Sequence, residues 1–488
     1  MSQELNKKSG RALAWSSITE IIAKLIVPIV NIILARLLAP EAFGAVATIT
    51  MVITFAEVFT DAGFQKYIVQ HEFEDEEALN KSTNVAFWTN FAFSVIIVSL
   101  IIIFRNPIAK LVGSPELGKG IAIASLMILM VSFSSIQSAR FKRDLDFKPL
   151  FFVRIGSSLI PLLVTVPLAF VLRNFWALVI GSLTVHLFNA IALTVKSKWK
   201  PKLFYSLRLF KEMFSFSAWT LLESIVIWLT VNIDIFILGN VLDDHYLGIY
   251  KTSMNTVNSY MSIIISAIVP VLFSTLSRCQ DNDEEFSKTY YTFQKYTALF
   301  VMPMSVGVFI FRDFVVALLL GSQWKEAAGF VGIWAVMTGI TIIFSTLASE
   351  VYRSKGNPKL STFAQLLHIL FLIPTVLITS EYSFSVLYIS RSLIRIQFVI
   401  VNIIIMRVVY RFKLKTTLKN IFPIIISTCV MSVVGYLLEN IMSAIWWQLI
   451  SVLICVVVYF FTIFSFPKTR KAILSNLNIK KVIHNNTK

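Results

Sequence analysis

Apolar runs long enough to cross a lipid bilayer recur along the whole chain, and this feature constrains the fold most. Of the 488 residues, 56% are hydrophobic and only 15% are charged, whereas a soluble domain carries about 25% charged residues. Because lipid offers the backbone no hydrogen-bond partners, we predict an all-α polytopic membrane protein with short polar loops. At about 20 residues per span, we expect about fourteen spans, near 14–38, 42–66, 82–104, 119–138, 150–171, 175–195, 213–239, 245–273, 290–311, 326–350, 360–379, 384–406, 419–438 and 445–466.

The positions of Lys and Arg predict the orientation of these spans. If the N-terminus lies inside, cytoplasmic segments hold about 31 of the 44 Lys and Arg residues and external segments about 7, and cytoplasmic loops of membrane proteins carry such an excess. Both termini are therefore predicted to be cytoplasmic. The same asymmetry accounts for the net charge of +17, so we expect no nucleic-acid partner.

The chain contains an internal repeat. LARLLAPEAFG (34–44) and LGNVLDDHYLG (238–248) align without a gap at an offset of 204 residues, and each joins the first two helices of a predicted six-helix set. An even number of helices gives both sets the same orientation, which predicts a pseudo-two-fold axis along the membrane normal. The predicted parts are an N-terminal six-helix bundle (1–195), a basic cytoplasmic linker (196–212), a second six-helix bundle (213–406), two further helices (407–466) and a cytoplasmic tail (467–488).

Ionisable side chains within the apolar spans mark the candidate functional residues. Each costs roughly 2.5–3.5 kcal/mol on insertion scales, so such groups usually face the bundle interior or water. For a single residue, an internal helix pair such as Glu20 with Lys24, or snorkelling from a span end, is an equally good explanation. Their recurrence along single helical faces favours a water-filled cavity between the halves, with cations for an anionic headgroup and carboxylates for ion coupling or charge balance. The cation candidates are Lys24, Arg154, Lys251, Arg391 and Arg395, and the carboxylate candidates are Glu20, Glu57, Asp61, Glu223 and Asp234.

We find no motif in this sequence that is typical of an enzyme. The three cysteines stand singly, the five histidines are dispersed, and no phosphate-binding glycine loop occurs. We therefore expect no catalytic residues, no metal site and no cofactor, and we predict that the chain is not an enzyme.

Several segments resemble the polysaccharide flippases of the multidrug/oligosaccharidyl-lipid/polysaccharide exporter superfamily, the O-antigen and teichuronic-acid type. They are LARLLAPEAFGAVATITMVITFAEVFTDAGFQKYIVQ (34–70), ARFKRDLDFKPLFFVRIG (139–156) and YRSKGNPKL (352–360). The resemblance implies two six-helix bundles around a central cavity, alternating access, and a bacterial cytoplasmic-membrane location. It also implies an undecaprenyl-pyrophosphate-linked oligosaccharide as cargo, held by cavity cations, for lipopolysaccharide or exopolysaccharide synthesis.

The predicted function is thus the flipping of a lipid-linked oligosaccharide. Membrane lipids are expected partners, and a polysaccharide polymerase and glycosyltransferases are further candidates. Three alternatives stay open at this point. One is an ion-coupled drug or cation antiporter of the same superfamily that uses the carboxylates, and another is a peptidoglycan-precursor flippase. The third is a glycan polymerase or ligase, which the short external loops disfavour.

Overall fold

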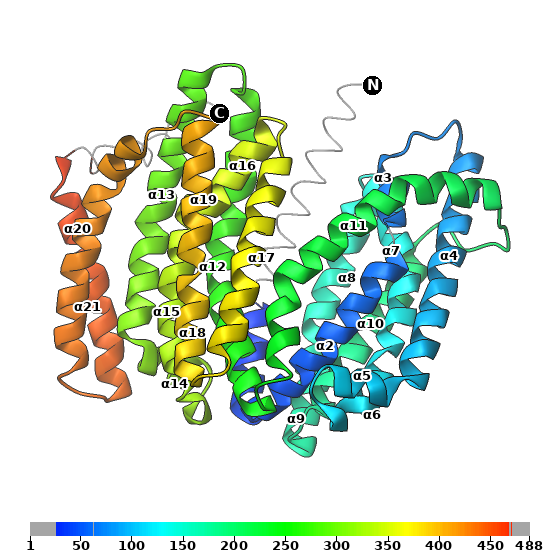
Figure 1. Cartoon of the computed structure of the whole chain (residues 1–488), viewed down its shortest axis with the longest axis horizontal. Coiled ribbons are helices and arrows are strands. Elements are labelled where there is room, and N and C mark those ends of the chain that lie inside the picture. The colour runs from blue at the N-terminus through cyan, green and yellow to red at the C-terminus, as the bar shows by residue number, and fades with distance from the viewer. Residues whose placement is uncertain (1–25, 62, 468–469, 471–488) are drawn as a thin grey trace, which may run out of the picture. The chain divides into compact units, whose positions relative to one another are not determined.

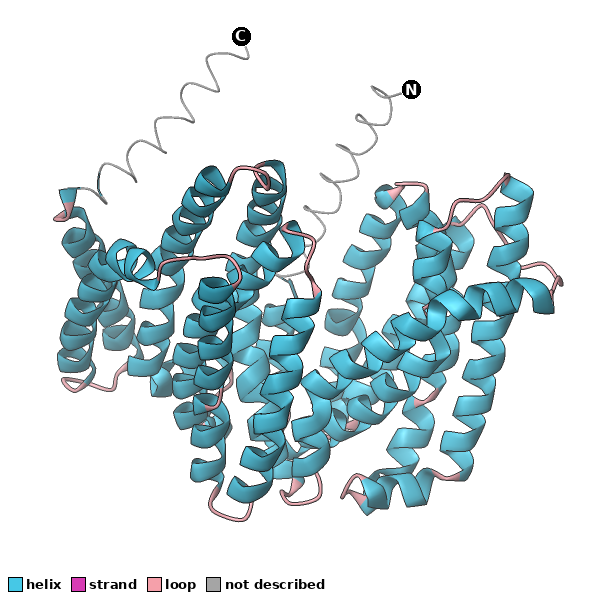
Figure 2. Ribbon diagram, turned by 45° about the horizontal axis from the view of Figure 1, so that its top comes forward, coloured by secondary structure: helices cyan, strands magenta, loops and turns pink. Residues whose placement is uncertain are grey.

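The computed structural model describes residues 26–61, 63–467 and 470. All regular elements in these residues are helices, and short loops join them (Figure 2). The predicted residues Glu20 and Lys24, and almost all of the predicted cytoplasmic tail, lie outside the described part of the chain.

Twelve helices in the described residues are long and apolar enough to cross a membrane. Two shorter apolar helices, Ile26–Leu37 and Ser224–Leu238, fall within the predicted first and seventh spans. The prediction of an all-α polytopic membrane protein is therefore confirmed, with fourteen as an approximate count. The candidate spans are Pro40–Thr60, Glu76–Ile103, Pro115–Arg143, Phe147–Leu172, Trp176–Lys196, Asp244–Arg278, Asp283–Ile310, Ala327–Ser354, Lys359–Thr379, Phe384–Val408, Leu414–Glu439 and Ile445–Phe464.

The helices form two compact units (Figure 1). The first unit holds the described residues up to Thr252 together with Val376–Phe384, and the second holds Ser253–Thr375 with the described residues from Ser385. The elements up to the first unit's end are α2 (Pro40–Asp61), α3 (Phe64–Gln70), α4 (Glu76–Ile103), α5 (Arg105–Leu111), η1 (Pro115–Leu117), α6 (Gly118–Ala124), α7 (Leu126–Arg143), α8 (Phe147–Ile160), η2 (Pro161–Thr165), α9 (Val166–Leu172), α10 (Trp176–Lys196), α11 (Leu207–Leu238) and the start of α12 (Asp244–Arg278).

In the second unit, α13 packs against α15 and α20, and α20 packs against α21. Its elements after α12 are α13 (Asp283–Ile310), α14 (Arg312–Leu319), η3 (Ser322–Trp324), α15 (Ala327–Thr341), η4 (Ile342–Thr346), α16 (Leu347–Ser354), α17 (Lys359–Thr379), α18 (Phe384–Leu393), α19 (Arg395–Val408), α20 (Leu414–Glu439) and α21 (Ile445–Phe464). Helix α11, which the sequence analysis assigned mainly to the second bundle, packs along α2, α3 and α4. The predicted domain limits remain predictions.

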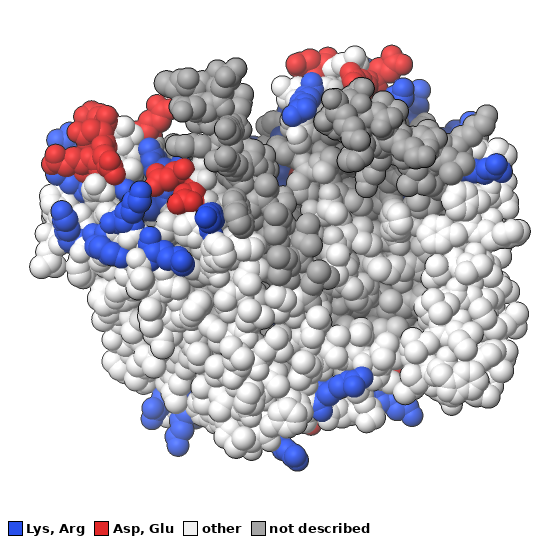
Figure 3. All heavy atoms as spheres, turned by 180° about the vertical axis from the view of Figure 1, so that it is seen from behind, with Lys and Arg blue, Asp and Glu red and all other residues white. Residues whose placement is uncertain are grey.

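The surface has the distribution of charge that a lipid bilayer requires. On the face shown in Figure 3, charged side chains gather along two opposite edges, and uncharged residues cover most of the band between them. Many large apolar side chains are exposed on the protein surface; for example, Val171 is 79% exposed and Phe461 is 77% exposed. Exposed apolar side chains in such numbers are stable only against lipid.

In each unit, a side chain at the end of the second inter-span loop caps the helix that follows. Asp75 caps α4 by accepting a hydrogen bond from the Ala78 backbone nitrogen at 2.6 Å, and Asn282 caps α13. Acidic residues fill the first turn of both helices, where the helix dipole favours negative charge. The acidic run HEFEDEE (71–77) thus contains the start of α4.

The basic loops that follow the fourth helix of each set hold these segments in place. Arg143 donates to the backbone oxygens of Ile68 and His71 at 2.8 and 2.6 Å, and its guanidinium lies over the Phe73 ring. In the second unit, Lys355 donates to the Gln280 backbone oxygen at 2.6 Å and lies over the Phe286 ring. The two loops therefore have matching structural roles within their own units.

A second repeat becomes visible only with the structure. FRNPIAKLVGS (104–114) and FRDFVVALLLGS (311–322) each form a short helix, α5 or α14, followed by a 3-10 turn. The glycines before these turns, Gly113 and Gly321, have φ angles of 81° and 105°, a region that only glycine adopts without strain. The match indicates that the internal repeat extends to the third and fourth helices of each set.

Candidate functional site

Two of the predicted cations in the second unit lie on one aromatic ring. A single turn residue, Ile394, separates α18 from α19. Arg391 is the third residue before that turn and Arg395 is the first residue after it. The Cζ atoms of Arg391 and Arg395 lie 5.1 and 4.2 Å from the centroid of the Trp334 ring. Both arginines therefore lie against the same ring although the helix is interrupted between them, and their role as substrate-binding cations remains a prediction.

Other side chains hold this arginine–tryptophan cluster in place. The Trp334 indole nitrogen donates to Asn258 Oδ1 at 3.4 Å, and Arg395 Nη1 donates to Thr338 Oγ1 at 2.6 Å. The Phe330 ring lies edge-on to Trp334 at 5.6 Å. Since Trp334 and Arg391 are 2% and 6% exposed, the ring and one guanidinium are almost completely removed from solvent.

The chemistry of the cluster suits an anionic group. Guanidinium is planar, stacks on aromatic faces and presents a fork of donors that matches phosphate geometry. Two guanidinium groups on one ring repel each other, and an anion beside them would offset that repulsion. We therefore regard Arg391, Arg395 and Trp334 as the candidate anion-binding site of the second unit.

The predicted site residues of the first unit occupy varied environments. Glu57 on α2 and Lys251 on α12 are half-buried, while Arg154 on α8 is exposed. Asp234 is 1% exposed and accepts hydrogen bonds from the Tyr250 hydroxyl at 2.8 Å and the Ile235 backbone nitrogen at 2.9 Å. These bonds give Asp234 a structural role in joining α11 to α12.

Two further carboxylate candidates are placed only by their backbone. Asp61 is the last residue of α2 and Glu223 lies within α11, but the side chains of both are outside the described part of the structure. With Glu20 and Lys24, they remain predictions.

The two repeated segments of the first unit cross at their glycines. A Cβ atom built on Gly44 of α2 would overlap the backbone oxygen of Asp244 at the start of α12. A Cβ atom built on Gly248 would overlap the backbone oxygen of Pro40 in the same way. Each glycine thus contacts the repeat equivalent of the residue that the other contacts, so the crossing is self-complementary and needs glycine on both sides.

A polar pair flanks this glycine crossing. Nδ1 of His245 lies 2.8 Å from Oε1 of Glu41, and these residues are separated by the repeat offset of 204. By the predicted topology the crossing lies at the external ends of both helices. It therefore joins the first helix pair of one repeat directly to that of the other.

Comparison with known proteins identifies the family of the chain. The model of a family described as polysaccharide biosynthesis protein matches residues 33–329, which is more than half of the sequence. The chain belongs to this family. The predicted membership among polysaccharide flippases of the exporter superfamily agrees with this match.

Several curated relatives from this polysaccharide family are similar to the chain. They include the succinoglycan biosynthesis transport protein ExoT of Rhizobium meliloti, which is 25% identical over 314 residues, and the lipopolysaccharide biosynthesis protein WzxC of Escherichia coli, 21% identical over 360 residues. The aligned parts cover 64% and 72% of this chain. The chain spans 63% of ExoT, slightly less than two thirds, and 69% of WzxC. These names agree with the prediction that the chain is a transporter and not an enzyme.

Solved structures show the same fold. The lipid II flippase MurJ in an inward closed conformation is 17% identical, with a TM-score of 0.78 over 93% of this chain and 99% of that chain. An inward-facing multidrug transporter of the MATE family is 14% identical, with a TM-score of 0.64 over 80% and 98%. These likenesses show the fold, an all-helical membrane protein built from two bundles.

Sequence reasoning missed the aromatic and small residues that organise these sites. Trp334 and Thr338 lie four residues apart on α15, and each contacts an arginine of the cluster. Their i, i+4 spacing was a usable signal, but an uncharged pair in an apolar helix has many ordinary explanations. Gly44 and Gly248 were recognised as a repeat, although nothing in the sequence indicated that they touch.

Proposed function

We propose that this polysaccharide biosynthesis family member flips an undecaprenyl-pyrophosphate-linked oligosaccharide across the bacterial cytoplasmic membrane. The observation that carries the proposal is the combination of a polysaccharide family match with the fold of a lipid flippase over 93% of the chain. Both termini are cytoplasmic in this proposal, as the distribution of Lys and Arg predicts. The headgroup enters from the cytoplasmic side and leaves outside, while the lipid tail remains in the bilayer.

The physical problem is to move a large polar headgroup past an apolar band. Burying its hydroxyl groups and charges without partners would be very costly, so the transporter must supply a polar path. The arginine–tryptophan cluster supports such a path because two guanidiniums can bind the pyrophosphate through charge-assisted, bidentate hydrogen bonds. Arg154 and Lys251 are further cation candidates, and Glu57 remains a candidate for ion coupling.

Alternating access also requires contacts that close the external side of the transporter and that can separate. We assign this role to the glycine crossing of α2 and α12, which joins the two repeats through backbone contacts and the Glu41–His245 pair. Its helices would have to separate at their external ends for the headgroup to leave.

A cross-link tests this assignment. In a chain whose cysteines Cys279, Cys429 and Cys455 are replaced, the pair Glu41→Cys and His245→Cys is joined by a short reducible reagent that reacts with two thiols. We expect export to stop and to recover on reduction, with either single cysteine variant unaffected by the reagent. Continued export with the cross-link intact would refute the assignment.

The function itself is tested in a strain that lacks the gene. We expect lipid-linked oligosaccharide to accumulate on the cytoplasmic face, and the intact gene to restore export. The double variant Arg391→Gln/Arg395→Gln should fail to restore it despite normal expression. The matched control is Arg407→Gln, which removes an exposed arginine from α19, the helix that also holds Arg395. Restoration by the double variant would refute the arginine site while leaving the flippase proposal standing.

Two alternatives have specific support. The fold likeness to a lipid II flippase favours a peptidoglycan-precursor flippase, and the likeness to a multidrug transporter favours an antiporter. The polysaccharide relatives favour our proposal over both. The same deletion strain distinguishes them: a defect in peptidoglycan precursors indicates the first alternative, and changed drug susceptibility without glycan accumulation indicates the second.

A further inference from the structure

The linker between α10 and α11 is an ordered strap, defined here as residues 197–206. Ser197 and Trp199 are buried, while Lys196, Lys198 and Lys200 are exposed. This alternation is the pattern of an extended segment, in which successive side chains point to opposite sides. The strap therefore presents a lysine row, Lys198, Lys200 and Lys202, to one side and inserts Trp199 on the other. The Lys200 ammonium group also donates to the backbone oxygens of Thr194 and Val195 at the end of α10.

Contacts with α4 fix the strap in position. The backbone nitrogen of Lys202 donates to Asn84 Oδ1 at 2.9 Å, and the Trp88 indole nitrogen donates to the Lys202 backbone oxygen at 2.9 Å. The Trp199 ring packs against Phe87 with centroids 6.0 Å apart. Since these bonds use the backbone of Lys202, its ammonium group stays exposed.

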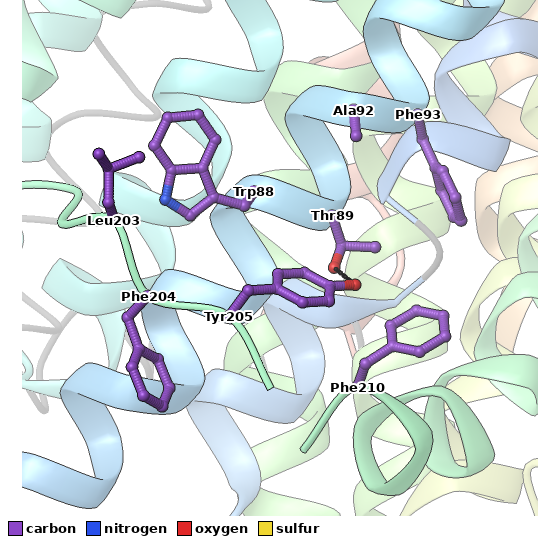
Figure 4. Close-up of a pocket in the computed structure, with 8 residues that line it drawn as sticks. All are labelled: Trp88, Thr89, Ala92, Phe93, Leu203, Phe204, Tyr205 and Phe210. Atoms are coloured by element: carbon purple, nitrogen blue, oxygen red, sulfur yellow. Dashed lines mark hydrogen bonds between the residues drawn. The ribbon is translucent and has the colours of Figure 1, made fainter. Parts of the chain in front are cut away.

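An apolar groove opens beside the strap (Figure 4). Its volume is about 730 Å³, within the range of pockets that hold drug-sized ligands. Its two polar side chains, Thr89 and Tyr205, are hydrogen-bonded to each other at 3.1 Å. The apolar lining comes from Trp88, Ala92 and Phe93 of α4, Leu203 and Phe204 of the strap, and Phe210 of α11.

The edge of the groove carries side chains that suit a membrane interface. Leu203 is 92% exposed and Leu207 is 69% exposed, so both need an apolar neighbour outside the protein. Exposed Lys202 and Arg208 flank them in sequence. Apolar side chains interleaved with basic ones are typical of segments that lie in the headgroup region of a leaflet rich in anionic lipid.

We propose that the groove and the strap lysines form a binding site for an anionic phospholipid of the cytoplasmic leaflet. One acyl chain occupies the groove, and the phosphate lies at the lysine row. Charge complementarity selects an anionic lipid, and the groove volume suits an acyl chain better than the much longer undecaprenyl chain. The site rests on the proposed cytoplasmic position of the linker and not on the identity of the transported glycan.

The test measures binding of phosphatidylglycerol to the purified full chain by native mass spectrometry, with phosphatidylcholine as the neutral comparison. The variant Lys198→Gln/Lys200→Gln/Lys202→Gln removes three strap charges. Each lysine near an anionic surface changes affinity by about five-fold, so we expect phosphatidylglycerol to bind about a hundred-fold more weakly. The variant Ala92→Trp, at an exposed position of α4, should fill the groove and weaken both lipids.

The matched control is Lys413→Gln/Lys415→Gln/Lys419→Gln, which removes three exposed lysines at the start of α20. Unchanged phosphatidylglycerol binding in this control supports a local site. Equal losses in both triple variants, or no loss in the strap variant, would overturn the proposal. Strap-dependent binding of undecaprenyl phosphate but not of phosphatidylglycerol would also overturn it in favour of the carrier lipid. None of these outcomes depends on glycan export, so failure here and failure of the flippase proposal are distinguishable.

Discussion

The arginine–tryptophan cluster and the strap are both cationic, yet they differ in residue type and burial. In the cluster, Arg391 is 6% exposed and stacks with Arg395 on Trp334. On the strap, Lys198 and Lys202 are exposed beside an apolar groove. Guanidinium is weakly hydrated and stacks on rings, so it tolerates burial, whereas the strongly hydrated ammonium group favours the interface.

This difference shows that the sign of the charge alone does not identify a transport site. A count of Lys and Arg treats both regions as the same signal, because the orientation rule depends only on which side the charges occupy. Burial and aromatic partners distinguish the arginine–tryptophan cluster from the strap. In our proposals, headgroup recognition therefore belongs to the arginine–tryptophan cluster and membrane association to the exposed lysines of the strap.

The largest effect is expected when the ring that unites the cluster is removed. Trp334→Ala deletes a buried side chain, which typically costs about 3–5 kcal/mol, and also removes both cation–π contacts. We expect a strong fall in thermal stability and loss of glycan export. Trp334→Phe keeps an aromatic face and should retain most of both. Equal damage by Phe and Ala would mean that the indole hydrogen bond to Asn258 matters more than the ring face.

A conservative exchange tests whether geometry matters in addition to charge. Arg391→Lys/Arg395→Lys keeps both positive charges but removes the planar fork of donors. Since a hydrogen bond to a charged group contributes about 1.5–3 kcal/mol, we expect export to fall by about ten-fold or more. The measurement is the rate of export at matched expression. Full activity would show that the headgroup is held by point charges, as we propose for lipid at the strap.

Salt should separate the two regions further. The Debye length falls from about 10 Å at 0.1 M to about 3 Å at 1 M salt, and exposed charges are screened more than buried ones. We expect phosphatidylglycerol binding to weaken several-fold at high salt, while the thermal stability difference between the native chain and Trp334→Phe stays constant. Binding that resists salt would contradict a role for exposed lysines.

The smallest effect is expected from the reciprocal exchange. Lys198→Arg/Lys200→Arg/Lys202→Arg preserves the charge of the strap, and all three positions are exposed. Phosphatidylglycerol affinity should stay within about two-fold, because the attraction of a basic segment to an anionic surface depends on its charge. A large change in either direction would indicate side-chain geometry at the strap and would weaken the contrast with the cluster.

Much of the fold was predictable because span formation depends on local properties. Most helices, such as α10 and α17, lie within a few residues of their predicted limits, since about 20 apolar residues suffice to define a span. The exceptions have local causes. Helix α4 begins at Glu76 and not near 82 because Asp75 supplies a cap, and α11 begins at Leu207 because Ser206 accepts from Leu209.

The candidate site was predictable only in part. Arg391 and Arg395 were selected because charge inside an apolar span is rare. Their common partner could not be selected in this way, since Trp334 resembles any apolar residue of its helix. Asp234 illustrates the opposite case, because its intramembrane charge marked it as functional while the structure shows bonds to Tyr250 and its own helix.

The sequence by itself determined that this is a membrane protein, and it determined the helical class, the internal repeat and the family. These properties follow from composition, the length of apolar runs and residue order. Tertiary structure alone decided that Gly44 and Gly248 cross, that two arginines share Trp334, and that the strap rests on α4. These contacts join residues between 57 positions (Arg391 and Trp334) and 208 positions (Gly248 and Pro40) apart. Chain spacing does not encode such proximity. It arises when helices pack their side chains together at close to crystalline density, which brings distant residues into one environment.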